Sequence, residues 1–295
     1  MIRKPDYLSP SSLKTWEEDR REYYIRYLSV RVPRPLQTVQ MALGSAFDGL
    51  VKNEIERRYG LTLRDYTAQV EAHQRDAVAG PAQRIMDWYM PYVGRLLIVG
   101  EPHCETDLGH VINYKRASGV VAAVPLRGKP DLWWGDTMHD WKVNGFYSEA
   151  SPAPGYRWDS KSLAAWKGRG AQAMLQPTAV ALPWMDQLIT YSWMVPNIKH
   201  VMVHQLTQRG GAARLTEYWR VIDNGEAEAL RGRYIHMWES IITGRVFTDL
   251  TPEADTLEQQ ALDRVCAGLA PTAPSGDAKA DALNEWFTTA TRGGL

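Results

Sequence analysis

The chain has 295 residues, of which 44% are hydrophobic and 23% are charged. These proportions are typical of a globular protein with a sizeable core, arranged as one large domain or two ordinary ones. Lys and Arg together number 34, as do Asp and Glu, so the formal net charge is zero. A neutral chain is not expected to coat nucleic acid through bulk charge, although a local basic groove is compatible with it.

Cysteine usage and hydropathy narrow the class of protein further. The two cysteines, Cys104 and Cys266, are too few for a four-cysteine zinc or iron–sulfur site, and they argue against a disulfide framework. The first ten residues, MIRKPDYLSP, lack the apolar run of a signal peptide, and no apolar stretch is long enough to span a bilayer. We therefore expect a cytoplasmic protein with no membrane partner.

Helical spacing of apolar residues dominates the first third of the chain. It predicts helices over residues 13–28, 41–58 and 66–90, the last ending just before Pro91. After Gly100, short runs rich in Val, Ile and Trp alternate with Gly and Pro, which is typical of strands separated by turns. The strands are expected at residues 110–115, 119–126, 129–135, 137–143, 201–208 and 214–222.

Two more helices and a tail complete the expected elements. The helices are predicted near residues 185–194 and 226–243. The segment from Thr251 is rich in acids, and we interpret residues 251–295 as a solvated helical appendage. Between the strands at 129–135 and 137–143, Gly135-Asp136 is a hairpin-type turn.

Chemically active residue types gather in the segment KPDLWWGDTMHDWK. Asp140 and Lys142 lie two residues apart on one predicted strand, so they share a face while Trp141 points to the other. If the two strands pair as a hairpin, Asp131 reaches the same spot. Two carboxylates and the backbone carbonyl of Trp141 form a hard oxygen site suited to Mg²⁺ or Mn²⁺, beside a lysine that can steady phosphoryl charge. The alternative interpretation is a solvated strand edge that follows a turn.

Two further pairs each share a helix face, since their members are four residues apart. Gly44 permits the close approach of another backbone, and Asp48 could supply a third metal ligand. Gln187 and Tyr191 can hydrogen-bond a phosphate or the edge of a base. Taken alone, each pair is better explained by an ordinary packed helix.

The order of the segments SPSSL, GSAFD, GKPD, DWK and QLITY resembles the PD-(D/E)xK nuclease superfamily, in particular its RecB-type exonuclease branch. The resemblance covers roughly residues 8–195. It implies that Asp131 and Asp140 are the metal-binding acids, with the Trp141 carbonyl as a further ligand, and that Lys142 is the active-site lysine. It also implies an α/β fold with a restriction-endonuclease-like core, a central mixed sheet flanked by helices, and a helical N-terminal arch.

The same resemblance assigns the helix pairs and shows three departures. Asp48 stands where the branch usually has a metal-binding His, and Gln187 and Tyr191 match its substrate-side motif. Some relatives, CRISPR-associated ones included, hold an iron–sulfur cluster on four cysteines, but the matching region at residues 16–23 has none, so no cluster is expected here.

The third departure is the long gap between Lys142 and Gln187, and we interpret residues 145–185 or so as an insertion. Between Ala150 and Met185 the bases outnumber the one acid, Asp159, and aromatic residues are interleaved with them, as in channels that bind single-stranded nucleic acid. The alternative is a surface loop whose aromatic residues pack back on the core. The substrate-binding candidates in this segment are Arg157, Trp158, Lys161, Lys167 and Arg169.

Other potential sites carry weaker signals. The histidines show no metal-site spacing, and Glu101 and Glu105 are better explained as strand-edge residues than as metal ligands. No phosphate loop ending in Gly-Lys-Ser/Thr is found, so a helicase would have to be a separate partner.

We expect residues 1–250 to form the nuclease domain. The expected function is a Mg²⁺- or Mn²⁺-dependent DNA exonuclease that acts on single strands or duplex ends, in recombination, repair or phage DNA processing in a bacterial cytoplasm. A helicase or a single-strand annealing or binding protein would be its partner. One alternative is a DNA- or protein-binding module that has lost cleavage. The other is an endonuclease that uses the same core.

Overall fold

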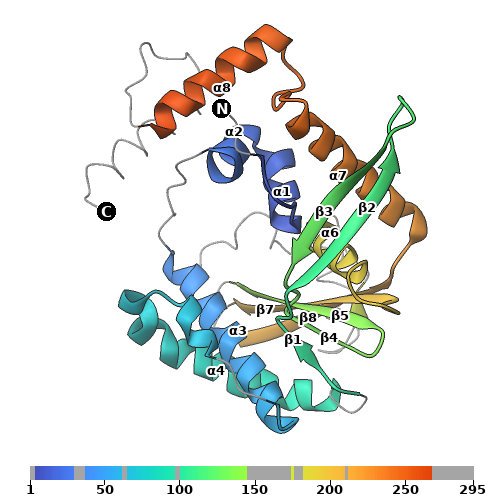
Figure 1. The fold of residues 1–295 in the computed structure, drawn as a ribbon. Helices are drawn as coiled ribbons and strands as arrows, with labels where there is room; N and C mark the ends of the chain where they lie inside the picture. The colour runs from blue at the N-terminus through green and yellow to red at the C-terminus, as the bar shows by residue number, and fades with distance from the viewer. Residues whose placement is uncertain are drawn as a thin grey trace. The chain divides into compact units, whose positions relative to one another are not determined.

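The computed structural model of the chain describes residues 4–29, 37–61, 65–96, 100–144, 174–175, 182–209 and 212–267. The chain divides into two compact units, each built from segments that are far apart in the sequence. The terminal unit comprises Met1–Pro35, Val111–Leu126 and Arg231–Leu295. The sheet unit comprises Leu36–His110 and Arg127–Leu230 and contains the central sheet (Figure 1).

A six-stranded mixed sheet with the order β1-β4-β5-β7-β8-β6 forms the centre of the sheet unit. β5 and β7 are parallel, whereas the β4–β5 and β7–β8 pairs are antiparallel. Sequence analysis does not predict β1 and β6, because strands of two residues carry no alternating pattern. The strands are β1 (His103–Cys104), β4 (Leu132–Trp134), β5 (Thr137–Asn144), β6 (Met174–Leu175), β7 (His200–Arg209) and β8 (Ala212–Val221).

The expected hairpin between β4 and β5 is confirmed. Its turn contains Gly135, whose φ of +54° lies in the left-handed region that favours glycine. Leu132 pairs with His139. The residue before Leu132 is Asp131, and the residue after His139 is Asp140. The turn and its register therefore bring the two acids together where β5 continues beyond its pairing with β4.

Helices cover both faces of this sheet. On one face, Trp141 of β5 donates its indole N–H to the hydroxyl of Tyr89 in α4 (Arg75–Leu96) at 2.7 Å. On the other face, Tyr218 of β8 packs edge-on against Trp184 of α6 (Leu182–Ser192), with ring centroids 6.2 Å apart. The expected α/β fold, a central mixed sheet flanked by helices, is therefore confirmed.

The two long helices of the sheet unit are α3 (Val39–Arg58) and α4. Two short 3-10 turns, η2 (Tyr66–Gln69) and η3 (Ala72–Gln74), lie between them in the sequence. α3 follows the prediction closely. α4 does not, because it begins at Arg75 and continues through Pro91 to Leu96. A proline inside a helix removes one hydrogen bond. Ile85 and Tyr89 of α4 are buried in the core shared with α3, and this packing offsets that loss.

The helices of the terminal unit begin with α1 (Pro10–Glu18), α2 (Arg20–Tyr23) and a π-helical turn η1 (Tyr24–Leu28). The single helix expected over residues 13–28 is thus interrupted at Asp19. The side chain of Asp19 accepts hydrogen bonds from the backbone N–H groups of Arg21 and Glu22, so it caps a new helix instead of continuing the old one.

The remaining elements are a two-stranded sheet, β2 (Leu108–Lys115) with β3 (Val121–Gly128), and the helices α7 (Asn224–Ile242) and α8 (Pro252–Cys266). α8 agrees with the expected helical tail up to residue 266, but it is not solvated on all sides. Its Asp255 is 1% exposed, and the hydroxyl of Tyr24 donates to its Asp263 at 2.9 Å.

Residues 268–295 lie outside the described part of the chain. The division into a nuclease domain at 1–250 and an appendage at 251–295 stays a prediction. Among the residues that the structure describes, none of the helices combines the length and the apolar character that a membrane crossing needs.

Candidate active site

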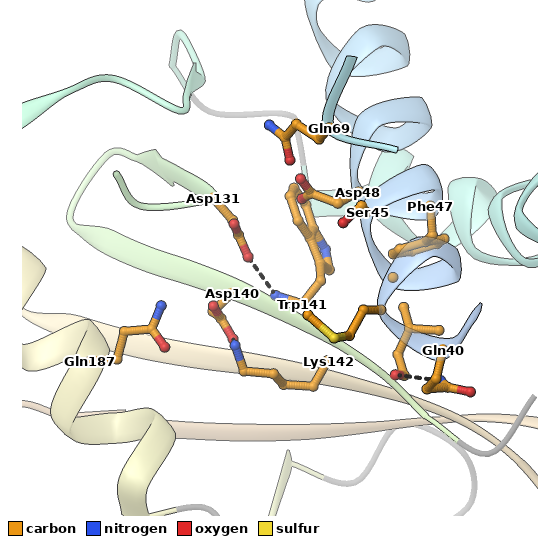
Figure 2. Close-up of a pocket in the computed structure, with 13 residues that line it drawn as sticks. Gln40, Ser45, Phe47, Asp48, Gln69, Asp131, Asp140, Trp141, Lys142 and Gln187 are labelled. Atoms are coloured by element: carbon orange, nitrogen blue, oxygen red, sulfur yellow. Dashed lines mark hydrogen bonds and ion pairs between the residues drawn. The ribbon is translucent and has the colours of Figure 1, made fainter. Parts of the chain in front are cut away.

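A pocket of about 360 Å³ opens at the free edge of β5, between residues of α3 and α6 (Figure 2). That volume is at the small end of ligand pockets. The predicted site residues with polar side chains that line it are Asp48 of α3, Asp131 before β4, Asp140 and Lys142 of β5, and Gln187 of α6. Gln40, Ser45 and Gln69 add further polar groups that were not predicted.

The position of Asp131 is fixed by the backbone of β5. β4 pairs with β5 only as far as His139, and beyond it the N–H of Trp141 donates to Asp131 Oδ2 at 3.2 Å. In a strand, the N–H and C=O of one residue leave the same edge. The carbonyl of Trp141 therefore leaves the edge where Asp131 lies, and this is the geometry expected of a backbone ligand. The Trp141 side chain is buried on the other side.

Asp140 and Lys142 share a face of β5, as their spacing predicts. Lys142 Nζ lies 2.5 Å from Asp140 Oδ2, and the Asp140 side chain is 2% exposed. Burial raises the pKa of Asp140 to about 7, against the lowering effect of the Lys142 ammonium. Asp131 behaves differently, because Lys52 and Lys142 outweigh its burial and hold its pKa below the usual value.

Lys52 belongs to this cluster, although sequence analysis missed it. Its side chain is fully buried, and its Nζ lies 2.5 Å from Asp48 Oδ2, 3.1 Å from Glu105 Oε1 and 3.3 Å from Asp131 Oδ1. Burial lowers the pKa of Lys52, but the three carboxylates outweigh burial and raise it above the ordinary lysine value. The available signal was its spacing, four residues after Asp48 on the same helix face.

Asp48 has the least compensated charge of the group. Burial raises its pKa to about 8, and the charge of Asp131 adds to this effect, while Lys52 opposes it. Its Oδ2 pairs with Lys52, but its buried Oδ1 has no hydrogen-bond partner in the described part of the chain. A buried carboxylate oxygen without a partner is unusual and indicates a missing donor or cation.

Glu105 lies in the cluster, and not at a strand edge as expected. It follows β1 with φ at +42°, a conformation that is rare for residues other than glycine and is enriched at functional sites. Its Oε1 accepts from Lys52 and, at 2.9 Å, from Gln69 Nε2. The sequence carries no periodic signal for this turn.

The α6 residues behave as a pair. Gln187 lines the pocket, and its Nε2 donates to the Tyr191 hydroxyl at 3.3 Å. Tyr191 is only 7% exposed, and burial raises its pKa to about 12. The structure thus brings Gln187 to the pocket and places Tyr191 behind it, as its support.

Gly44 lies on the pocket side of α3. We expected it to permit the close approach of another backbone. Instead, a Cβ built on Gly44 would have no atom within 4 Å among the described residues. Gly44 therefore leaves this side of the pocket open, since no described residue fills the space that its Cβ would occupy.

The chemistry of the donor set fits a divalent cation. Asp48, Asp131, Asp140 and Glu105 bring four carboxylates against the two ammonium groups of Lys52 and Lys142, which leaves two formal negative charges. All the donors are hard oxygens, which Mg²⁺ and Mn²⁺ prefer. Within the described ranges, however, no three acidic, His or Cys side chains converge as ligands of one ion. Instead, the ammonium groups of Lys52 and Lys142 lie against these carboxylate oxygens.

Other predicted residues cannot be placed. Arg157, Trp158, Lys161, Lys167 and Arg169 lie outside the described residues, as does most of the predicted insertion at 145–185. The absence of an iron–sulfur cluster stays a prediction.

Comparisons with known proteins leave the family open. No family model matches the chain, and no curated protein matches it. One solved structure, "Crystal structure of SSO0001", aligns with a TM-score of 0.28 and 13% sequence identity over 81% of this chain and 95% of that one. A likeness of this degree carries no argument about function.

Proposed function

We propose that the protein is a Mg²⁺- or Mn²⁺-dependent deoxyribonuclease of the PD-(D/E)xK type, with a restriction-endonuclease-like core, that removes nucleotides from DNA ends. One observation carries the proposal. The β4–β5 hairpin brings Asp131, Asp140 and Lys142 into one pocket, with the Trp141 carbonyl at the same edge. Two acids, a backbone oxygen and a lysine at this spacing suit the hydrolysis of a phosphodiester.

The acids would hold the metal. Asp131, Asp140, Asp48 and the carbonyl of Trp141 are the ligands that the donor chemistry favours. When bound, the divalent ion would act as a Lewis acid on the phosphodiester.

The chain's own residues supply the remaining functions. The ammonium of Lys142 lines the pocket, where it can orient a water molecule and stabilise negative charge that develops on the phosphate. The amide of Gln187, supported by Tyr191, can donate to a phosphate oxygen and so position the strand. The basic and aromatic residues of the 145–185 segment are the proposed contacts to the rest of the strand, and a helicase or single-strand annealing protein is the proposed partner.

A nuclease assay with Mg²⁺, Mn²⁺ or EDTA tests the proposal. The substrates are linear single-stranded, linear double-stranded and covalently closed circular DNA. We expect metal-dependent loss of linear DNA, and a loss of 100-fold or more in kcat for Lys142→Ala, as when a charge-stabilising donor is removed. Lys199→Ala, a change at an exposed lysine of the same unit, is the matched control and should keep full activity. Cleavage of the circle would identify an endonuclease instead.

A binding module without cleavage is the second candidate. The specific observation in its favour is that lysines, and not an open ligand set, pair with the carboxylates. Wild-type protein that retards DNA on a gel but is inert with every metal would support this candidate and contradict the nuclease proposal.

A further inference from the structure

Lys52 is the feature of this site that the proposed reaction does not use. A charged lysine is almost never fully buried unless it is paired, because removing the ammonium from water costs several kcal/mol. Its three carboxylate contacts come from three separate segments: α3, the turn after β1 and the residue before β4. An ammonium has three N–H donors, so each can be directed at one carboxylate oxygen.

The arrangement is that of a cation site. Asp48 Oδ2, Glu105 Oε1 and Asp131 Oδ1 surround a single positive charge, as the oxygen ligands of a metal do. Asp131 has its other oxygen, Oδ2, at the edge of β5, on the N–H of Trp141. One carboxylate that faces two neighbouring cation positions is the bridging arrangement of two-metal sites.

The net charge of the carboxylates and lysines also indicates that Lys52 takes the place of one metal ion. With all four carboxyls ionised, as metal binding requires, and both lysines charged, two negative charges remain, which one divalent ion balances. Without Lys52, three would remain, and three carboxylate oxygens would face an empty position.

We propose that Lys52 permanently occupies the second cation position of the centre, so that the site binds one divalent ion and not two. The inference deepens the proposed function and rests on it. The remaining position is the pocket edge of β5, where Asp140, the Trp141 carbonyl and Asp131 Oδ2 lie. Asp48 Oδ1 is buried and has no hydrogen-bond partner among the described residues, and it is the further oxygen available to the bound ion. Lys52 is therefore a positioning residue that sets the metal number.

Counting bound Mn²⁺ on the full chain tests this inference. The protein is titrated with Mn²⁺ at constant temperature, and the electron paramagnetic resonance signal of the free ion is recorded. The signal gives the number of bound ions per chain without any assay of cleavage. We expect one ion for the wild type and two for Lys52→Met, a change of similar length without the charge. Lys142→Met removes the same charge from the same cluster but not from the second position, so it should still bind one ion.

Any other number of bound ions would contradict the Lys52 inference, the nuclease proposal or both. Two ions on the wild type, or one on Lys52→Met, would overturn the Lys52 inference and leave the nuclease proposal standing. Two ions on both lysine variants would also overturn it, because bulk charge and not position would then set the number. No Mn²⁺ on the wild type would overturn the metal-dependent nuclease together with the inference.

A folding control keeps the test decisive. Lys52→Met leaves three buried carboxylates without their cation, so it is expected to unfold more easily, and Mn²⁺ should raise its Tm more than that of the wild type. If it does not fold even with Mn²⁺, Lys52→Gln takes its place, because the amide removes the charge but keeps a hydrogen-bond donor for the carboxylates. It should bind two ions, and one ion on it would overturn the proposal.

Discussion

The ring of Tyr191 lies in the space that a side chain on Gly128 would need. A Cβ at residue 128 would be 2.8 Å from Tyr191 Cδ1 and closer still to Cε1. Gly128 ends β3, three residues before Asp131, and Tyr191 supports Gln187 at the pocket. The glycine therefore allows α6 to approach the chain that leads to the site.

Gly128→Ala should displace the Tyr191 ring. We expect a loss of about 1–3 kcal/mol in the free energy of unfolding, as for other overpacked positions, measured by urea denaturation. Gly232→Ala is the matched control, because a Cβ there meets nothing within 4 Å in the described part and Gly232 lies inside α7. It should be stabilising by about 0.5–1 kcal/mol. Equal effects of the two changes would show that the Tyr191 contact is unimportant.

Gly44 gives a test of the pocket that rests on the proposed function. Gly44→Leu projects an apolar side chain into the open space on the pocket side of α3, so we expect KM for linear DNA to rise about tenfold or more, a loss of about 1.4 kcal/mol in binding. Gly44→Ala should fold at least as well as the wild type and keep most of the activity. Unchanged kinetics for the leucine variant would mean that the strand does not pass this helix face.

Two buried histidines make the sheet unit sensitive to acid. His139 Nδ1 and His204 Nε2 are 3.1 Å apart, both side chains are at most 2% exposed, and burial lowers the pKa of His204 to about 3. In the unfolded chain both histidines take up protons near pH 6.5, whereas in the folded chain His204 does so only near pH 3, and burial also holds the pKa of His139 well below its ordinary value. The contribution of these histidines to stability is therefore complete above pH 6.5 and falls as the pH decreases below it, by up to about 1.4 kcal/mol per pH unit for each histidine.

Urea unfolding at pH 7 and pH 5 measures this effect. His204→Gln keeps a polar group beside His139 but cannot titrate, so it should lose less stability between the two pH values than the wild type. Glu217 lies beside His204, and burial raises the pKa of its carboxyl, which favours the folded state as the pH decreases and opposes the trend. Since both proteins contain Glu217, the comparison isolates the histidine. His73→Gln, at a 66% exposed side chain, should behave as wild type.

Among the acidic residues of α8, replacement of Asp255 should destabilise the protein most. It is 1% exposed and accepts hydrogen bonds from the backbone N–H of Phe247 at 3.0 Å, from Gln259 and from Arg245. Asp255→Ala leaves the buried Phe247 N–H without an acceptor, and we expect it to cost about 3 kcal/mol in thermal or urea unfolding. Glu253→Ala, at an exposed position of the same helix, should cost less than about 1 kcal/mol. A small effect at Asp255 would contradict the burial of this helix face.

The parts of the site that could be predicted from the sequence are those fixed by local geometry. Asp140 and Lys142 share a face because strand side chains alternate, and Asp131 reaches them because Gly135 favours a tight turn. Lys52 and Glu105 could not be found in this way. They are 53 residues apart, and only the packing of α3 against the turn after β1 makes them partners.

The same distinction applies to the fold. α3 and the longer strands carry regular patterns and were predictable. The break at Asp19 and the passage of α4 through Pro91 were not, because a side-chain cap and a tertiary contact each override the apolar periodicity. A resemblance based on motif order gives no information about such features.

The terminal unit contains residues from both ends of the chain, and this affects when it can fold during synthesis. Tyr24 and Asp263 form a hydrogen bond although 239 residues separate them. Trp16, Tyr23 and Tyr24, all buried in the finished protein, thus leave the ribosome early, while α8, the partner of Tyr24, is synthesised close to the end. The sheet unit is complete at Leu230 and can fold first. Until α8 has been synthesised, Tyr24 lacks this partner. The apolar side chains of the first helices can then be bound by chaperones.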